Sequence, residues 1–222
     1  IENAFNQTSK HLIIKNLIDL GLSGNIVMII DSFLTERTFK VKANNKISRE
    51  HTINNLLPQG SPLSPLLFQI AIIKILKDIT PSIDTRILIF ADDITILGSS
   101  NKNCGNKNID NMISNLYNWA NKFGYNFNKS KAKQLHFCKF YKCTNKNYQL
   151  NKSEITIEKV IKILGLNFDK KLNWKFHLEY LKNKAIKHLN LIKILSKSKF
   201  GTDREKLIFI LKTLFFGTYD YG

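Results

Sequence analysis

Cysteine is scarce in this sequence, and the spacing of the few cysteines excludes two kinds of small stabilised fold. The chain has 222 residues and three cysteines, Cys104, Cys138 and Cys143. An odd count without a CxxC pair is not the pattern of a disulfide framework or of a zinc site. It is typical of proteins in a reducing compartment, so we expect an intracellular location.

Long apolar runs are also missing. Runs such as Ile26–Ile30 are short, and none approaches the roughly 20 residues of a membrane span. The chain starts at Ile1 without an initiator methionine or a signal-peptide pattern. We therefore expect no membrane partner, and the start is typical of the interior of a longer protein.

Acidic residues are few relative to basic ones. Asp and Glu number 17 against 34 Lys and Arg, which gives a net charge of +17 and a pI of about 9.8. Such an excess favours a polyanionic partner such as nucleic acid. Codon bias is the alternative, because Lys, Asn and Ile share A/T-rich codons and the only arginines are Arg37, Arg49, Arg86 and Arg204. Both explanations stay open at this stage.

The spacing of apolar residues predicts a mixed first part and a helical last part. In the first part, stretches with helical periodicity alternate with extended runs such as Arg86–Phe90 and Ile94–Leu97. After residue 169 the apolar positions recur at helical spacing only. We predict an α+β fold with two domains, residues 1–168 and residues 169–222.

Local signals predict several element limits. Ser61 followed by Pro62 indicates a helix start, and Thr202 with Glu205 forms a capping-box pattern before a last helix. The other expectations are a turn at Asn44-Asn45, an extended segment over Asn126–Phe137, a loop over Lys139–Lys152, a hairpin over Lys159–Leu166, and a core-facing row of Leu66, Leu67, Ile70, Ile73 and Leu76.

Asp92 and Asp93 are the strongest candidates for chemistry. They lie between two apolar extended runs, where a pair of carboxylates is costly unless its charge is compensated. A tight hairpin turn can bring both carboxylates to one site, and Mg²⁺ in proteins takes one or two carboxylates together with substrate phosphates. An exposed Asp-Asp turn without any ligand is the alternative on this pair alone.

Several motifs in a fixed order resemble the reverse transcriptase domain of non-LTR (LINE-type) retrotransposons. Two of them are highly specific together: Leu57–Phe68, with the sequence LPQGSPLSPLLF, and Phe90-Ala91-Asp92-Asp93. The other matching segments are Ile1–Asn6, Phe33–Val41, Phe127–Lys131, Leu164–Trp174 and Phe209–Gly222. The resemblance implies a right-hand polymerase fold, with an antiparallel palm sheet and flanking helices followed by a helical thumb.

The resemblance also implies roles for individual residues at the reaction centre. Asp92 and Asp93 match the metal ligands, for two Mg²⁺ ions or alternatively Mn²⁺. Gln59 and Gly60 match positions that line the incoming nucleotide and the template; an ordinary turn before a helix is their structural alternative. Ala91 belongs to the same metal-binding motif and is expected beside the substrate.

Four further residues are matched with less specific motifs. Phe5 matches the aromatic residue that excludes a ribose 2′-hydroxyl, and a core phenylalanine is the alternative. Lys131 matches a general acid for departing pyrophosphate, with Lys129 and Lys133 as rivals and a solvated lysine as the alternative. Arg37 could bind template or triphosphate phosphates or be ordinary surface charge. Trp174 fits thumb packing better than base stacking.

Two departures from the family pattern bear on activity. The first motif of the family begins with a metal-binding Asp directly before the position of Ile1, and Asn6 replaces the usual Asp after Ala-Phe. With two carboxylates left, metal ligation loses charge. We therefore expect little or no polymerase activity from the 222-residue chain.

The leading hypothesis is an RNA-directed DNA polymerase, a nucleotidyltransferase that uses an RNA template, a DNA primer and dNTPs. A catalytically dead nucleic-acid-binding relic or domesticated module is the alternative from another class. A group II intron-type maturase is a third interpretation, although Phe33–Val41 and Leu164–Trp174 favour the retrotransposon branch. The family resemblance also implies a nuclear step.

Overall fold

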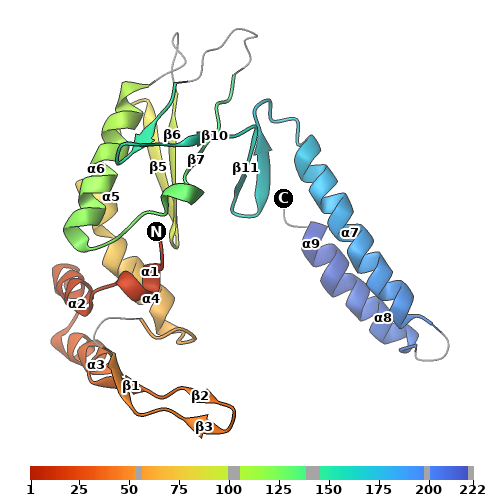
Figure 1. The fold of residues 1–222 in the computed structure, drawn as a ribbon, viewed down its shortest axis with the longest axis horizontal. Coiled ribbons are helices and arrows are strands. Elements are labelled where there is room, and N and C mark those ends of the chain that lie inside the picture. Colours follow the sequence, from red (N-terminus) through yellow and green to blue (C-terminus); the bar gives the residue numbers. More distant parts are fainter. Residues whose placement is uncertain (54–56, 100–105, 139–145, 198–200, 220–222) are drawn as a thin grey trace. The chain divides into compact units, whose positions relative to one another are not determined.

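Helices and short strands alternate along the chain, which confirms the mixed α+β class. The computed structural model describes residues 1–53, 57–99, 106–138, 146–197 and 201–219 (Figure 1). The chain forms two compact units: Ile1–Ala132 with Thr144–Ile155, and Lys133–Cys143 with Thr156–Gly222. Among the described residues, no helix has the length and apolar character needed to cross a membrane.

The first unit holds most of the helices. They are α1 (Ala4–Gln7), α2 (Lys10–Asp19), α3 (Gly24–Leu34), α4 (Leu63–Ile72), α5 (Lys74–Asp78), α6 (Lys107–Phe123) and the 3-10 turn η1 (Lys129–Lys131). Its strands are β1 (Arg37–Phe39), β2 (Lys42–Ala43), β3 (Lys46–Ile47), β4 (His51–Ile53), β5 (Thr85–Phe90), β6 (Asp93–Gly98), β8 (Gln149–Leu150) and β9 (Ser153–Glu154). These strands pair two by two, each with an antiparallel partner.

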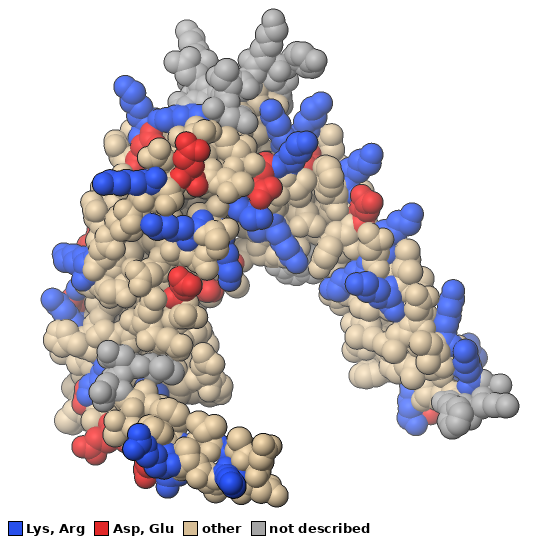
Figure 2. Space-filling view, in the orientation of Figure 1, with Lys and Arg blue, Asp and Glu red and all other residues tan. Residues whose placement is uncertain are grey.

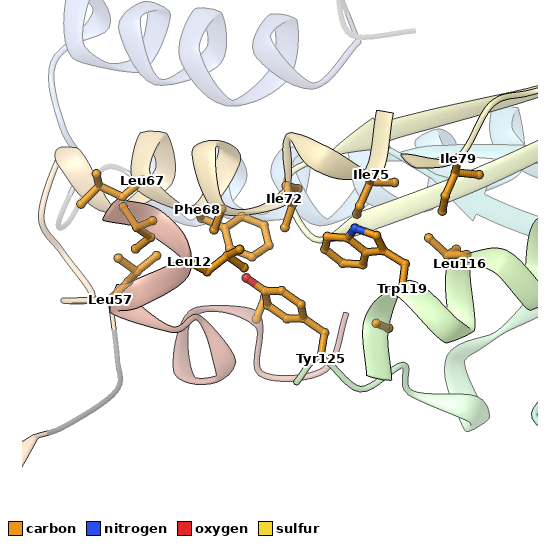
Figure 3. Packing of buried hydrophobic residues seen from close by; sticks show 14 of the residues in the cluster. Leu12, Leu57, Leu67, Phe68, Ile72, Ile75, Ile79, Leu116, Trp119 and Tyr125 are labelled. Carbon is orange, nitrogen blue, oxygen red and sulfur yellow. The ribbon is translucent and has the colours of Figure 1, made fainter. Parts of the chain in front are cut away.

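The core of the first unit lies between α2, α4, α5 and α6. Figure 3 shows Phe68, Ile72 and Ile75 facing the aromatic side chains of Trp119 and Tyr125. The two aromatic rings stack at 5.6 Å between centroids, with an interplanar angle of 6°. Each fully buried side chain of this size stabilises the fold by about 1.5–3 kcal/mol. This core therefore fixes the helices against one another and supports the hairpin that follows them.

The buried face of α4 differs from the predicted row. Leu66 and Leu76 are exposed, while the buried side chains are Ser64, Leu67, Phe68, Ala71, Ile72 and Ile75. The observed positions follow the helical spacing of three and four residues as well as the predicted ones do. The segment is apolar on almost every side, so periodicity alone could not choose between the two faces.

Asn16 marks the point where α4 ends and α5 begins. Its side chain is almost fully buried, and its amide nitrogen donates to the carbonyl oxygens of Ile70 (2.8 Å) and Ala71 (3.2 Å). Carbonyl groups at a helix C-terminus have no partner inside the helix. A side chain from α2 therefore satisfies the end of α4 and ties the two helices together.

The hairpin of β5 and β6 confirms the two predicted strands. Thr85 lies opposite Gly98 and Phe90 lies opposite Asp93, so the connecting turn has two residues. Because side chains alternate across a strand, the isoleucines Ile87, Ile89, Ile94 and Ile96 pack on the core. The other side of the hairpin carries Arg86, Leu88 and Phe90 and is open to solvent.

A second hairpin, which we call the ribbon (residues 37–53), projects from the end of α3 (Figure 1). Its strands β1 and β4 pair from Arg37–Ile53 to Phe39–His51, and β2 and β3 continue it. The predicted turn at Asn44-Asn45 is confirmed, with both φ angles positive at 47° and 61°. The ladder is interrupted at Lys40 and Val41, between β1 and β2.

The second unit combines small strand pairs with a helical pair. Its strands are β7 (Lys133–Gln134), which pairs in parallel with β10 (Thr156–Ile157), and the antiparallel pair β11 (Val160–Ile163) and β12 (Leu166–Asp169). Its helices are α7 (Lys175–Leu195), α8 (Arg204–Ile210), the π-helical segment η2 (Leu211–Phe216) and α9 (Gly217–Tyr219). The Tyr219 hydroxyl donates to the Leu181 carbonyl oxygen at 2.8 Å, which holds α9 against α7.

Asp169 links β12 to α7 within the second unit. Its carboxylate accepts hydrogen bonds from the backbone N–H groups of Lys171 (3.0 Å), Asn173 (3.2 Å) and Trp174 (2.9 Å). Burial raises the pKa of this carboxyl, but the backbone donors together lower it below its ordinary value. Trp174 itself packs on Phe168 at 5.3 Å between ring centroids, and its ring remains partly exposed.

Three local predictions need correction or qualification. The cap of α8 is Asp203, whose carboxylate accepts from the Lys206 N–H at 2.9 Å, and not Thr202. The segment Asn126–Phe137 is interrupted by η1. Part of the loop predicted over Lys139–Lys152 lies outside the described residues, and β8 forms within the remainder. The hairpin predicted over Lys159–Leu166 is confirmed, although it extends to Asp169.

The division of the chain into functional domains at residue 169 stays a prediction. In the structure the hairpin of β11 and β12 falls in the same compact unit as α7. The Asp169 hydrogen bonds explain this grouping, because they bind the end of the hairpin directly to the start of the helix.

Candidate active site

The candidate carboxylates lie at the turn of the β5–β6 hairpin. Ala91 and Asp92 form the turn, and Asp93 is the first residue of β6. Ala91 has a φ angle of 49°, a left-handed conformation that favours glycine but that two-residue hairpin turns require. Asp92 and Asp93 are both exposed. Solvent therefore reduces the cost of placing the two charges side by side.

The start of the chain lies against this turn. The amino group of Ile1 donates to the backbone carbonyl oxygen of Asp92 at 2.7 Å. Burial lowers the pKa of that amino group, and the negative charges of Asp92 and Asp93 oppose the shift without cancelling it. The positive charge of Lys131 adds to the lowering. One small region thus brings together the start of the chain, both carboxylates and Lys131.

Hydrogen bonds from two other segments hold the first residues in place. The Glu2 N–H donates to the Asn126 carbonyl oxygen at 2.8 Å, and the Asn126 N–H donates to the Gln7 side chain at 2.8 Å. The Leu57 N–H donates to the Phe5 carbonyl oxygen at 3.0 Å. Segments that are far apart in the sequence therefore converge on residues 1–7, whose first residue lies against the β5–β6 turn.

Lys131 is the lysine of its segment that belongs to this region. It is exposed at the end of η1, where the Asn128 side chain accepts from its N–H at 3.1 Å. Its charge reaches the Ile1 amino group. Lys133 instead pairs with Glu158 at 3.2 Å, in the second unit, and Lys129 is exposed. Lys131 thus acts electrostatically on the Ile1 amino group, and the choice of Lys131 over its two rivals stays a prediction.

Phe5 combines core packing with partial exposure. Its ring lies 5.4 Å from the ring of Phe68, measured between centroids, and it packs on the main core while remaining half-buried. One side of the Phe5 ring therefore packs as a core phenylalanine would, and the other side is partly exposed. The backbone of the same residue is bonded to Leu57, at the start of the segment that contains Gln59 and Gly60.

Gln59 and Gly60 form an exposed turn before α4. The Ser61 N–H donates to the Pro58 carbonyl oxygen at 3.3 Å, and the Ser64 hydroxyl donates to the same oxygen. Gly60 has a φ angle of 92°, as the third residue of a type II turn requires. A methyl group placed on Gly60 would meet nothing within 4 Å. The positive φ angle of the turn explains why a glycine occupies position 60, and the space around its Cα is open.

Arg37 is not part of this convergence. It lies in β1 at the base of the ribbon, opposite Ile53. Figure 1 shows β1 well separated from the turn between β5 and β6. Its expected role at template or triphosphate phosphates stays a prediction.

Sequence reasoning did not find the contacts that bring the segments together. The Ile1–Asp92 and Glu2–Asn126 hydrogen bonds use backbone atoms, so they cannot be predicted from the type of any side chain. The Gln7 side chain, which accepts from Asn126, was also missed because a glutamine near a helix end has no specific signature.

The donor set of this region suits a hard cation. Asp92 and Asp93 supply carboxylate oxygens on adjacent residues, and Mg²⁺ usually takes one or two carboxylates together with substrate phosphates. No cluster of three or more His, Cys, Asp or Glu that could hold a metal occurs within the described ranges. The two carboxylates therefore fit a metal whose remaining ligands come from substrate or from further protein groups.

Comparison with known proteins identifies a family for most of this chain. The family model described as "Reverse transcriptase (RNA-dependent DNA polymerase)" matches residues 1–168, which include the β5–β6 turn and every segment that converges on it. The chain belongs to the reverse transcriptase family. Its membership of this enzyme family confirms the resemblance drawn from the sequence.

Curated relatives of this chain come from mobile elements of Drosophila melanogaster. It is 25% identical over 202 residues to the probable RNA-directed DNA polymerase from transposon X-element, covering 87% of this chain and 22% of that protein. It is 26% identical over 160 residues to the RNA-directed DNA polymerase from mobile element jockey, covering 69% of this chain and 17% of that protein. The chain thus spans about a fifth of the length of these relatives.

Proposed function

We propose that this chain is the palm and thumb part of a retrotransposon RNA-directed DNA polymerase. Residues 1–168 would form the palm with part of the fingers, and residues 169–222 the thumb or a connecting segment. The observation that carries the proposal is the convergence of the Ile1 amino group, Asp92, Asp93 and Lys131 within a chain of this family. The RNA template, DNA primer and dNTPs are the proposed partners.

The proposed reaction joins a primer 3′-hydroxyl to the α-phosphate of a dNTP and releases pyrophosphate. Asp92 and Asp93 would hold Mg²⁺, which supplies electrostatic stabilisation of the phosphate charges. The exposed position of both carboxylates at a two-residue turn leaves them accessible to a triphosphate. The protein itself contributes alignment of the reacting groups, which the core under the hairpin keeps rigid.

Other residues around the turn have proposed roles in substrate binding. Lys131 would donate a proton to the departing pyrophosphate. The partly exposed ring of Phe5 would exclude a 2′-hydroxyl, and the open space at Gly60 would let the template or nucleotide approach the backbone. Gln59 would contact the same substrate from the turn, and Ala91 would let the substrate approach the hairpin closely.

The position before Ile1 gives a direct test. The Ile1 nitrogen is hydrogen-bonded to the Asp92 carbonyl oxygen. An aspartate added before Ile1 is attached at this nitrogen and so lies next to the turn that carries Asp92 and Asp93. We expect the 222-residue chain to show little Mg²⁺-dependent primer extension on an RNA template, and the chain with an added Asp to extend the primer. Asp92→Asn in the extended chain should abolish extension, whereas the exposed Asp78→Asn should leave it unchanged.

A nucleic-acid-binding module without catalysis is the second candidate. It is favoured by the net charge of +17 and by the presence of only two carboxylates at the turn. In that case hybrid binding persists, but neither the added Asp nor a supply of Mg²⁺ or Mn²⁺ produces extension. Robust extension by the unmodified 222-residue chain would contradict both the expected low activity and this second candidate.

A further inference from the structure

The ribbon (residues 37–53) contributes little to the core of its unit. Within it, β1 pairs with β4 and β2 pairs with β3. Figure 1 shows β2 and β3 extending away from α3 and the other helices. Phe39, Val41 and Ile47 are 45%, 54% and 65% exposed. A two-stranded hairpin without a packed face is at best marginally stable in water. A surface of this kind is therefore better explained by a binding role than by stabilisation of the fold.

The charge of the ribbon is strongly positive. Residues 37–53 contain five basic residues, Arg37, Lys40, Lys42, Lys46 and Arg49, and one acidic residue, Glu50. The resulting net charge of +4 in 17 residues is about three times the average density of the chain, which is +17 over 222. Figure 2 shows basic side chains standing out from this hairpin.

Codon bias does not explain this concentration. Such a bias acts along the whole sequence and favours lysine, yet two of the four arginines of the chain, Arg37 and Arg49, lie in the ribbon. One ion pair in the ribbon joins Lys40 and Glu50, at 3.5 Å. Beyond that pair, toward the Asn44-Asn45 turn, the ribbon has no acidic residue.

We propose that the ribbon binds the phosphate backbone of a nucleic-acid duplex, with Lys42, Lys46 and Arg49 as its principal contacts. This inference rests on the polymerase proposal and adds a surface for the template–primer outside the reaction centre. A two-stranded ribbon fits the major groove of B-form DNA, and on any duplex its cations can contact backbone phosphates without reading the bases. From Arg37 to Ala43, β1 and β2 together with the two residues between them span at most roughly 20 Å, long enough to cross several phosphates.

A protein partner fits the same surface less well. The central part of a protein–protein interface is depleted of charged residues, and lysine in particular is rare there. The apolar side chains of the ribbon are interspersed with lysines along both strands and do not form a separate face. Phosphate contacts use such scattered cations efficiently, because each one neutralises a charge independently of sequence.

Salt-dependent binding tests the proposal on the 222-residue chain. The variant K42Q/K46Q/R49Q is compared with K15Q/K77Q/K107Q, which removes the same charge from exposed positions elsewhere in the first unit. The probe is a fluorescent RNA–DNA hybrid duplex, titrated at several salt concentrations by anisotropy. We expect the ribbon variant to bind on the order of tenfold more weakly or worse, with a log–log salt slope less steep by roughly 2–3. The control variant should lose about twofold.

Equal losses in the two variants would overturn the proposal, because they would show a general effect of net charge. An unchanged affinity in the ribbon variant would also overturn it and would assign the ribbon to a protein contact or to solvent. Thermal unfolding of both variants should match the parent, because none of the six side chains is buried.

The outcome is separable from the polymerase proposal. Binding is measured without nucleotide, so loss of affinity in the ribbon variant supports the ribbon even if no chain extends a primer. Conversely, extension by the chain with an added Asp together with unchanged ribbon affinity would support the polymerase proposal and overturn the ribbon.

Discussion

The amino nitrogen of Ile1 lies 2.7 Å from the backbone carbonyl oxygen of Asp92, although 91 residues separate them in the sequence. This contact defines the candidate site more sharply than either carboxylate does alone. It places the start of the Ile1–Asn6 segment against the turn that carries Asp92 and Asp93.

The pKa of the Ile1 amino group leads to a prediction about stability and pH. Burial lowers this pKa below 8.0, so near neutral pH the unfolded chain binds more protons than the folded chain. The free energy of unfolding should therefore rise with pH up to about 8 and then level off. Urea denaturation at a series of pH values measures this slope. Acetylation of the N-terminus should remove it, and a slope that persists after acetylation belongs to another group.

Asn16→Ala should destabilise the first unit. The change leaves the carbonyl groups of Ile70 and Ala71 without their side-chain donor in a buried position, which costs about 1–3 kcal/mol of unfolding free energy. Asn25→Ala, at an exposed position of α3, is the matched control and should change stability by less than about 0.5 kcal/mol. Equal effects of the two substitutions in urea denaturation would show that the Asn16 hydrogen bonds do not contribute.

Asp169→Asn should destabilise the second unit in a pH-dependent way. The folded-state pKa of Asp169 lies below 3.8, so its contribution is present above that value and is lost as the pH falls through the folded-state pKa. The difference between wild type and variant should therefore be full at neutral pH and shrink in acid. The backbone N–H of Trp174 donates to the carboxylate, so unfolding of the second unit can be followed by near-ultraviolet circular dichroism of Trp174. A difference that is constant with pH would rule out the ionised carboxylate as its cause.

Gly60→Ala distinguishes the two explanations of this glycine. Its φ angle of 92° should cost about 1–2 kcal/mol for alanine, and Gly21→Ala, at a φ of 77°, should cost about the same. Neither added methyl group meets another atom within 4 Å. If substrate approaches Gly60, only Gly60→Ala should also weaken dNTP use, seen as a raised KM in the extension-competent chain. Equal kinetic effects of the two variants would leave the turn as the sole reason for the glycine.

Elements with local signals could be predicted from the sequence. The β5–β6 hairpin, the Asn44-Asn45 turn and the 160–169 hairpin each have their determinants within a few residues, so pattern and turn chemistry suffice. The cap of α8 was misplaced by one residue because Thr202 and Asp203 are both good caps, and only Asp203 reaches the Lys206 N–H.

Features that depend on distant partners could not be predicted. The helix α4 is apolar nearly all round, so the exposed positions of Leu66 and Leu76 follow from where α2 and α6 pack, not from α4 itself. For the candidate site, the sequence motifs supplied the candidate residues, Asp92, Asp93 and Lys131 among them, and their roles stay predictions. Their convergence with Ile1 depends on backbone hydrogen bonds that leave no trace in residue type.

The way in which the first residues are held also bears on the order of folding. Ile1, Glu2 and Phe5 find their backbone partners at Asp92, Asn126 and Leu57, so this segment cannot dock until residues much later in the sequence are available. Contacts between such distant positions carry a high cost of loop closure and form slowly. The Ile1–Phe5 segment should therefore dock late in folding, after the local β5–β6 hairpin that it contacts has formed.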